Sequence, residues 1–208
     1  MSGEFSGLSS CIGALEGMSI SIIEGGDFCL PDLAKRPWLE HDRQIGGMLL
    51  DLGTHAFAPL IAAGLLGADV RIHDVKLSKL SPDRFSLVPL RTDDEVEMYV
   101  STLLTAGNLP IQVAFGKVPF HGGVWAVAIR GERGMIYAGI NDGQPVAVIP
   151  DIGNPVVFFL NHPPYVVALE EALMYFAREL PGFDGYTEAF FVSMEILERI
   201  RSSYFATR

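Results

Sequence analysis

The stretch from Val124 to Ala138, VWAVAIRGERGMIYA, decides the expected fold. It contains two apolar runs, at 124–130 and 134–138, that are separated only by Gly131-Glu132-Arg133. So short a connection lets two strands pair antiparallel, whereas a parallel pair needs a crossover of roughly a dozen residues or more. The stretch therefore predicts a β-hairpin inside an antiparallel sheet.

Strand-like runs continue on both sides of this hairpin. Met18-Ser19-Ile20-Ser21-Ile22 alternates apolar and polar residues, which is the pattern of a half-buried strand. Further runs, separated by Gly, Pro, Asn and Asp, lie at 70–77, 95–104, 111–117, 145–149 and 155–160. We therefore expect one large, open and mostly antiparallel sheet.

Three segments have the spacing of helices that bury one face. The first is Gly46–Leu66, where Pro59 predicts a kink or break at His55, because proline removes a backbone hydrogen bond and clashes with the preceding turn. The other two are residues 163–180 and 187–203. One helix, a run of strands and two helices predict an α+β fold, with the helices on one face of the sheet.

The segment Asp27–Gln44 is irregular, with prolines and mixed charges, and it predicts a long loop. Loops of about 15 residues in compact domains are more often functional than accidental. Trp38, His41 and Arg43 in this segment are therefore candidate substrate-binding residues. The alternative is that they lie on a solvated loop without a role in binding.

The composition limits the class of protein. The 208 residues include 25 acidic and 15 basic side chains, and the formal net charge is −10. Nucleic acid is not an expected partner, because binding to phosphates needs clustered Lys and Arg, and the chain has no such run. With 49% hydrophobic and 19% charged residues, the chain should fold around a core. We expect a flexible lead-in at 1–11 and one domain at 12–208.

No segment predicts a membrane span or a secretory signal. The longest apolar tract, Ala56–Ala68, is interrupted by Pro59 and two glycines and is shorter than the ~20 residues of a spanning helix. Met1–Ser10 lacks a basic region followed by an apolar one. Cys11 and Cys29 are too few for a disulfide framework. A cytoplasmic location is the simplest expectation.

Asp51 and His55, in the segment GGMLLDLGTH at 46–55, are the strongest candidates for chemistry. In a helix, residues four apart share a face, with Cβ atoms about 5–6 Å apart. A carboxylate beside an imidazole fixes its tautomer and favours its protonated form, which suits a general acid/base. Gly53 between them removes bulk and would let a planar ligand approach the backbone. The alternative is a buried Asp–His pair that only orients the helix, and no metal site is expected.

This segment resembles the signature of the glucose-fructose oxidoreductase and inositol dehydrogenase family, known as Gfo/Idh/MocA. The matching positions are Gly46, Gly47, Leu49, Asp51, Gly53 and His55. Weaker similarities occur in the family's order at Ile12-Gly13, Trp38, Ile129–Ile136, Gly185–Ala189 and Met194–Leu197. Together they cover the chain from Ile12 to Ser203.

The resemblance implies a two-domain enzyme. An N-terminal Rossmann domain, absent from this chain, would bind NAD or NADP, and residues 12–208 would form a ferredoxin-like C-terminal domain that supplies the substrate pocket. His55 would act as general acid/base on a sugar, polyol or related hydroxy or carbonyl compound, and Asp51 would position the substrate and His55. The chain alone would bind no cofactor and would be inactive, because hydride transfer needs the other half of the site.

Two further expectations concern partners and class. A large sheet with three helices leaves one face uncovered, so we expect a homodimer or higher homo-oligomer through that face. A naturally short, non-catalytic binding or oligomerisation module with the same fold is the alternative to an enzyme domain. The length of the native reading frame distinguishes the two, because a Rossmann domain needs roughly 120 residues upstream.

Overall fold

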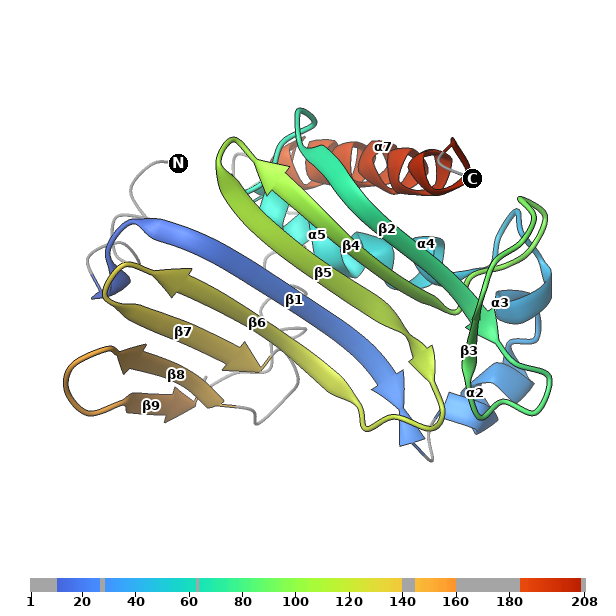
Figure 1. Ribbon diagram of the computed structural model, residues 1–208, viewed down its shortest axis with the longest axis horizontal. Helices are drawn as coiled ribbons and strands as arrows, with labels where there is room; N and C mark the ends of the chain where they lie inside the picture. Colours follow the sequence, from blue (N-terminus) through green and yellow to red (C-terminus); the bar gives the residue numbers. More distant parts are fainter. Residues whose placement is uncertain (1–10, 27–28, 63, 140–144, 160–183, 207–208) are drawn as a thin grey trace, which may run out of the picture.

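The computed structural model of the protein describes residues 11–26, 29–62, 64–139, 145–159 and 184–206. In this part of the chain, nine strands form one sheet with the spatial order β3-β2-β4-β5-β1-β6-β7-β8-β9 (Figure 1). The strands are β1 (Leu15–Gly25), β2 (Arg71–Leu80), β3 (Leu87–Pro89), β4 (Tyr99–Ala106), β5 (Leu109–Val118), β6 (Val124–Gly131), β7 (Gly134–Gly139), β8 (Pro145–Pro150) and β9 (Val156–Phe159). β1 and β5 run parallel, and the other neighbouring strands are antiparallel. The expected α+β fold with a large, mostly antiparallel sheet is confirmed.

The hairpin expected at 124–138 is the β6–β7 pair. Gly131 pairs with Gly134 beside the turn, and Ala126 pairs with Gly139 at the other end. The other expected runs coincide with strands to within a few residues, except that the run at 95–104 becomes a strand only at Tyr99. The sequence does not predict β3, because three residues carry too little alternation to indicate a strand.

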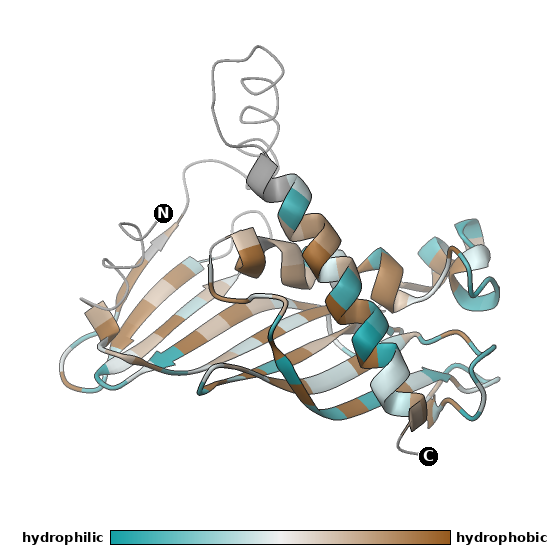
Figure 2. Ribbon diagram, turned by 90° about the horizontal axis from the view of Figure 1, so that it is seen from above, coloured by the Kyte–Doolittle hydropathy of each residue, from teal (hydrophilic) through white to brown (hydrophobic). Residues whose placement is uncertain are grey.

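The long helices lie on one face of this sheet (Figure 2). In chain order the described helices are α2 (Cys29–Lys35), α3 (Trp38–His41), α4 (Met48–Asp51), α5 (Gly53–Ala62) and α7 (Asp184–Ala206). α7 packs against α5 and β2, and α5 also reaches β1 and β5. Phe57 of α5 meets Phe115 of β5 edge-to-face, with ring centroids 6.3 Å apart, so α5 is fixed over the central strands.

The segment Asp27–Gln44 is not the single long loop expected from the sequence, because it holds α2 and α3. Pro31 indicated a loop, but it lies in the first turn of α2, where a helix has no use for its N–H. Asp32 also stands in this first turn, where a negative charge favours the helix, and Lys35 stands in the last. The short helices sit at the end of the sheet where β1 finishes (Figure 1).

The break expected at His55 is not found there. α5 continues through His55 and Pro59, and the interruption falls at Leu52, between α4 and α5. Gly53, the next residue, is a weak helix former, which favours a break there. The helix expected at 187–203 is confirmed as part of the longer α7, whereas the helix expected at 163–180 lies outside the described residues.

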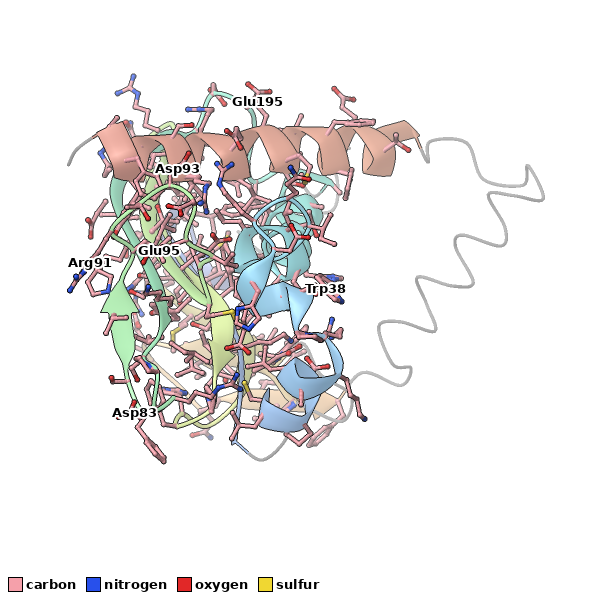
Figure 3. All side chains as sticks on the ribbon, turned by 90° about the vertical axis from the view of Figure 1, so that its right-hand side faces the viewer. Trp38, Asp83, Arg91, Asp93, Glu95 and Glu195 are labelled. Carbon is pink, nitrogen blue, oxygen red and sulfur yellow. The ribbon has the colours of Figure 1, made fainter. Side chains whose placement is uncertain are left out.

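A buried ion pair joins α7 to the loop before β4. Arg201 of α7, only 8% exposed, donates to the carboxylates of Glu97 and Asp93 and to the backbone carbonyls of Asp93 and Glu95. Figure 3 shows Asp93 and Glu95 beneath α7. Glu97 accepts a hydrogen bond from the N–H of Leu49 at 3.1 Å, at the start of α4. Burial raises the pKa of Glu97, and the charge of Arg201 opposes this rise.

The double glycine before α4 is required by this packing. Gly47 has φ +87°, and a Cβ at this position would lie 2.4 Å from Oε1 of Glu97. A Cβ at Gly46 would lie 2.2 Å from the carbonyl oxygen of Trp38. Both positions therefore need a residue without a side chain so that α3, α4 and the loop carrying Glu97 can meet.

Gly47→Ala should lower the free energy of unfolding more than Gly64→Ala. Both glycines have positive φ, which costs an alanine about 1–2 kcal/mol. Only at Gly47 does the added Cβ also meet Glu97, because nothing lies within 4 Å of a Cβ at Gly64. Chemical denaturation of the wild type and both variants measures the difference. Equal losses would contradict the role given to the contact with Glu97.

Candidate functional site

Two charged side chains continue the buried rows of the central strands. Towards the helices, β5 presents Ile111, Val113, Phe115 and then Lys117, and β1 presents Met18, Ile20, Ile22 and then Glu24. The strand register pairs Lys117 with Glu24, and partners on adjacent strands share a face. An ammonium group and a carboxylate therefore meet at the end of rows that are otherwise apolar.

Lys117 is the centre of five charged residues that we call the Lys117 cluster. Its ammonium group contacts the carboxylate of Glu24 and lies 3.1 Å from Oδ2 of Asp32 and 3.4 Å from Oδ2 of Asp51. Arg36 pairs with Asp32, and its Nη1 lies 3.2 Å from Oδ1 of Asp51. The members come from β1, α2, α4 and β5, so the cluster forms only where these four elements meet.

The cluster is buried at Lys117 and open to solvent at its carboxylates. The side chain of Lys117 has no exposed surface, whereas Asp51 is 18% exposed and Glu24 and Asp32 are each 31% exposed. Burial lowers the pKa of Lys117 to about 8, so the ammonium form still dominates at pH 7. Burial also raises the pKa of Asp51, and the positive charges of Arg36 and His55 oppose this rise.

His55 lies on α5, one turn beyond Asp51, and its side chain is exposed. Its charge acts on the Asp51 carboxylate across the break at Leu52, and among the described residues no hydrogen bond or ion pair joins the two side chains. The pair is therefore not enclosed in the core. An exposed imidazole beside an anchored carboxylate can give a proton to, or take one from, a ligand that approaches from solvent.

Two of the other candidate residues line separate cavities. His41 lines a cavity of about 440 Å³ together with Lys79 and Arg84, and both of these cations are already paired with glutamates. Arg43 lines a second cavity, of about 510 Å³, beside α7, where it lies 3.0 Å from a carboxylate oxygen of Asp93. The pairs Lys79–Glu95 and Arg43–Asp93 hold the loop between β3 and β4, and the pair Arg84–Glu40 joins the turn between β2 and β3 to α3.

Trp38 is 38% exposed and lies on the side of α3 away from the strands (Figure 3). In the described part of the chain, the ion pairs of the Lys117 cluster include neither Trp38 nor His41 nor Arg43. A role for these three residues in substrate binding therefore remains a prediction.

The space beside Gly53 is occupied by α7. A Cβ on Gly53 would lie 2.5 Å from Cδ2 of Leu197, and Gly53 itself is buried. Gly53 therefore lets two helices approach closely, and on this side Leu197 stands where a planar ligand was expected. The structure gives the glycine a packing role that spacing along the sequence does not reveal.

The sequence interpretation missed Lys117, Glu24, Asp32 and Arg36. A signal was present: Ile111, Val113 and Phe115 alternate as inward positions of a strand, and the next position in phase is Lys117. In the strand around Met18–Ile22, the same alternation leads from the inward residue Ile22 to Glu24. A charged residue in phase with a buried row indicates a partner or a site, because an unpaired buried charge is strongly unfavourable.

Metal binding and membrane insertion are two further possibilities for the described residues. Within the described ranges, no group of three His, Cys, Asp or Glu side chains is placed to hold a metal ion. Among the helices of those ranges, none is both long and apolar enough to cross a membrane.

Comparison with known proteins identifies the fold. No protein-family model and no curated protein matches the chain. Among solved structures, KijD10, a 3-ketoreductase from Actinomadura kijaniata in complex with NADP and TDP-benzene, matches with a TM-score of 0.64 and 19% identity over 96% of this chain and 58% of its own. The MviM dehydrogenase from Clostridium difficile matches with a TM-score of 0.62 and 14% identity over 96% and 58%.

A protein from Erwinia carotovora atroseptica described as an oxidoreductase gives a TM-score of 0.60 and 16% identity over 93% of this chain and 59% of its own. The chain therefore spans slightly more than half the length of the three structures. It shares the fold of that part of each structure.

Asp51→Asn should change the pH dependence of stability. Burial raises the folded-state pKa of Asp51 above the ordinary value of 3.8, so the folded protein binds more protons than the unfolded chain above that pH. The free energy of unfolding of the wild type should therefore fall, relative to the variant, as the pH rises from about 4 through the folded-state pKa. Urea denaturation at several pH values between about 4 and 8 measures this difference.

Asp74→Asn is the matched control, because Asp74 is a surface carboxylate on β2 that is 63% exposed. Its difference from the wild type should stay constant across the same pH range. A constant difference for Asp51→Asn as well would show that the environment of Asp51 does not favour its protonated form.

Proposed function

We propose that this chain is the substrate-binding and catalytic C-terminal domain of an NAD(P)-dependent oxidoreductase of the Gfo/Idh/MocA family. The observation that carries the proposal is the exposed imidazole of His55 beside Asp51, whose two carboxylate oxygens are held by Arg36 and Lys117. The fold shared with a 3-ketoreductase and a dehydrogenase supports it.

In this proposal His55 transfers a proton, and Asp51 assists the imidazole of His55. When a substrate hydroxyl is oxidised, the imidazole accepts the proton of that hydroxyl, and when a carbonyl is reduced, the imidazolium returns a proton to the oxygen. Asp51 acts on the imidazole through its charge, and its own carboxylate is fixed from two sides. The solvent-facing position of His55 leaves the imidazole accessible to a substrate.

The residues of this chain do not fit a dinucleotide. The sequence has no Gly-x-Gly-x-x-Gly turn between a strand and a helix to hold a pyrophosphate. We therefore assign NAD or NADP to a Rossmann domain that this chain does not contain, and we expect the chain alone to bind neither dinucleotide and to be inactive. The cofactor would supply or accept the hydride there.

A sugar or polyol is the substrate class that suits the cluster. Glu24 and Asp32 are partly exposed carboxylates, and a carboxylate only accepts hydrogen bonds, so it pairs well with substrate hydroxyl groups. The cluster also has one more carboxylate than cations, which disfavours a substrate with a phosphate in this position. KijD10 is a 3-ketoreductase, and its chemistry at a ketone agrees with this class.

His55→Ala should abolish most of the turnover of the full-length enzyme. We expect kcat to fall by about 10²- to 10⁴-fold with a smaller change in KM, which is the loss typical of a general acid/base. The measurement is steady-state oxidation of sugars and polyols by the protein encoded by the complete reading frame, with NAD and with NADP.

The control is His73→Ala, because His73 lies on β2, where its Nε2 is 2.8 Å from Oγ1 of Thr105. This variant should keep the wild-type kcat. A His55→Ala enzyme with full turnover would overturn the proposed function. A reading frame without a Rossmann domain would favour the non-catalytic module instead.

We also propose a homodimer through the face of the sheet opposite the helices. The strand registers align one row across this face, formed by Leu103, Gln112, Ser19, Ala128, Tyr137, Ala147 and Val157. Leu103, Tyr137 and Val157 in this row are exposed, and the residues between them are Gln112, Ser19, Ala128 and Ala147. No described helix covers the row (Figure 2), and an exposed apolar surface of this kind favours association.

Light scattering of the wild type should give the mass of a dimer at tens of micromolar protein. Tyr137→Glu should shift the protein to a monomer, because a charge on the middle of the row would be buried without a partner. Phe85→Glu is the control, since Phe85 is 78% exposed in the turn between β2 and β3 and lies outside the row. A monomeric wild type at this concentration would contradict the sheet-face dimer.

A further inference from the structure

We propose that Lys117 is a positioning residue for the proposed catalytic pair: its buried ammonium group opposes protonation of the Asp51 carboxylate and holds that carboxylate in place near His55. This inference rests on the proposed function, because it deepens the account of the same site. Lys117 touches no substrate in this proposal and acts through Asp51.

Two cations from different elements of the fold hold the Asp51 carboxylate. Nη1 of Arg36, on α2, lies 3.2 Å from Oδ1, and Nζ of Lys117, on β5, lies 3.4 Å from Oδ2. A carboxylate held at both oxygens cannot rotate freely. The Lys117 anchor is the buried one, because its side chain has no exposed surface, whereas that of Arg36 is 35% exposed.

Stability alone does not explain a lysine at this position. The row on β5 is apolar up to Phe115, and an apolar residue at 117 would continue it. Replacing buried ion pairs by well-packed apolar residues is often neutral or stabilising, so a buried ion pair is weak support for a purely structural role. A functional role of the positive charge explains the presence of an ammonium group at position 117.

The charges around Lys117 determine what its removal does. Glu24 faces it from β1, Asp32 from α2 and Asp51 from α4, and Arg36 from α2 is the other cation of the cluster. His55, on α5, acts on Asp51 from the solvent side. Without Lys117, the carboxylates of Glu24, Asp32 and Asp51 would lose their buried cation. Desolvation and repulsion among the three carboxylates would then both favour protonation of Asp51.

The first experiment is a carbon-13 NMR titration of the Asp51 carboxyl in the chain itself, in the wild type and in Lys117→Met. We expect the pKa of Asp51 to rise by about one unit or more in the variant, because an opposite charge within about 4–6 Å typically lowers a carboxyl pKa by that much. Lys79→Met is the matched control, since Lys79 pairs with Glu95 in another part of the fold. It should leave the Asp51 titration unchanged.

The second experiment does not depend on the folding of a variant that lacks Lys117. Asp51→Asn changes a partly exposed side chain and keeps its shape. Because coupling between two binding equilibria is reciprocal, this variant should lower the pKa of Lys117, read from the nitrogen-15 shift of Nζ, by the amount by which Lys117→Met raises that of Asp51.

Unchanged titration of Lys117 in Asp51→Asn would overturn the inference, as would an Asp51 titration that is the same in Lys117→Met and the wild type. Neither measurement reads enzyme activity. A failure of the proposed function, seen as full turnover in His55→Ala, is therefore distinguishable from a failure of the coupling between Lys117 and Asp51.

Discussion

The parallel pairing of β1 with β5 is the interaction on which the rest of the molecule depends. β5 and β6 are consecutive in the chain, yet β1 lies between them and hydrogen-bonds to both. This insertion makes β1 a central strand and carries its end, with Glu24, to the side of Lys117. It also brings α2, which follows β1 closely in the chain, to the place where Asp32 can reach Lys117 and Arg36 can reach Asp51.

The four-residue helix α4 is tied at both ends by separate ionic groups. At its start, Glu97 accepts a hydrogen bond from the N–H of Leu49, and Arg201 of α7 neutralises Glu97. At its end, Asp51 is held by Arg36 and Lys117. One ionic group thus connects α4 to the C-terminal helix, and the other connects it to the centre of the sheet. The short helix is fixed to both layers, and this gives Asp51 a defined position.

The sequence was sufficient for what depends on local pattern. Alternation and short connections predicted the strands around Val124–Ala138, and helical spacing predicted the segment that carries Asp51 and His55. It failed where tertiary contacts decide. Pro31 indicated a loop but lies in the first turn of α2, and Pro59 indicated an interruption at His55, whereas the helix is interrupted at Leu52. The space beside Gly53 is taken by Leu197, a residue far along the chain.

The Lys117 cluster is a second feature that local sequence pattern does not predict. Its members are separated by up to 93 positions in the chain, from Glu24 to Lys117, and only the parallel register between β1 and β5 brings them together. No spacing rule joins residues so distant. The periodicity of each strand could have marked Lys117 and Glu24 as charged residues in buried rows, but not as partners of each other or of Asp51.

The position of β1 also has a consequence for biosynthesis. Met18 pairs with Ile111, so β1 finds its parallel neighbour only after 93 further residues have been made. At roughly 5–20 residues per second, this takes roughly 5–20 s. During that time the apolar edge of a nascent β1 has no neighbour, and contacts of such high contact order close slowly even once the whole chain is available. Until β5 has been made, β1 is therefore exposed to the aggregation that unpaired strand edges promote.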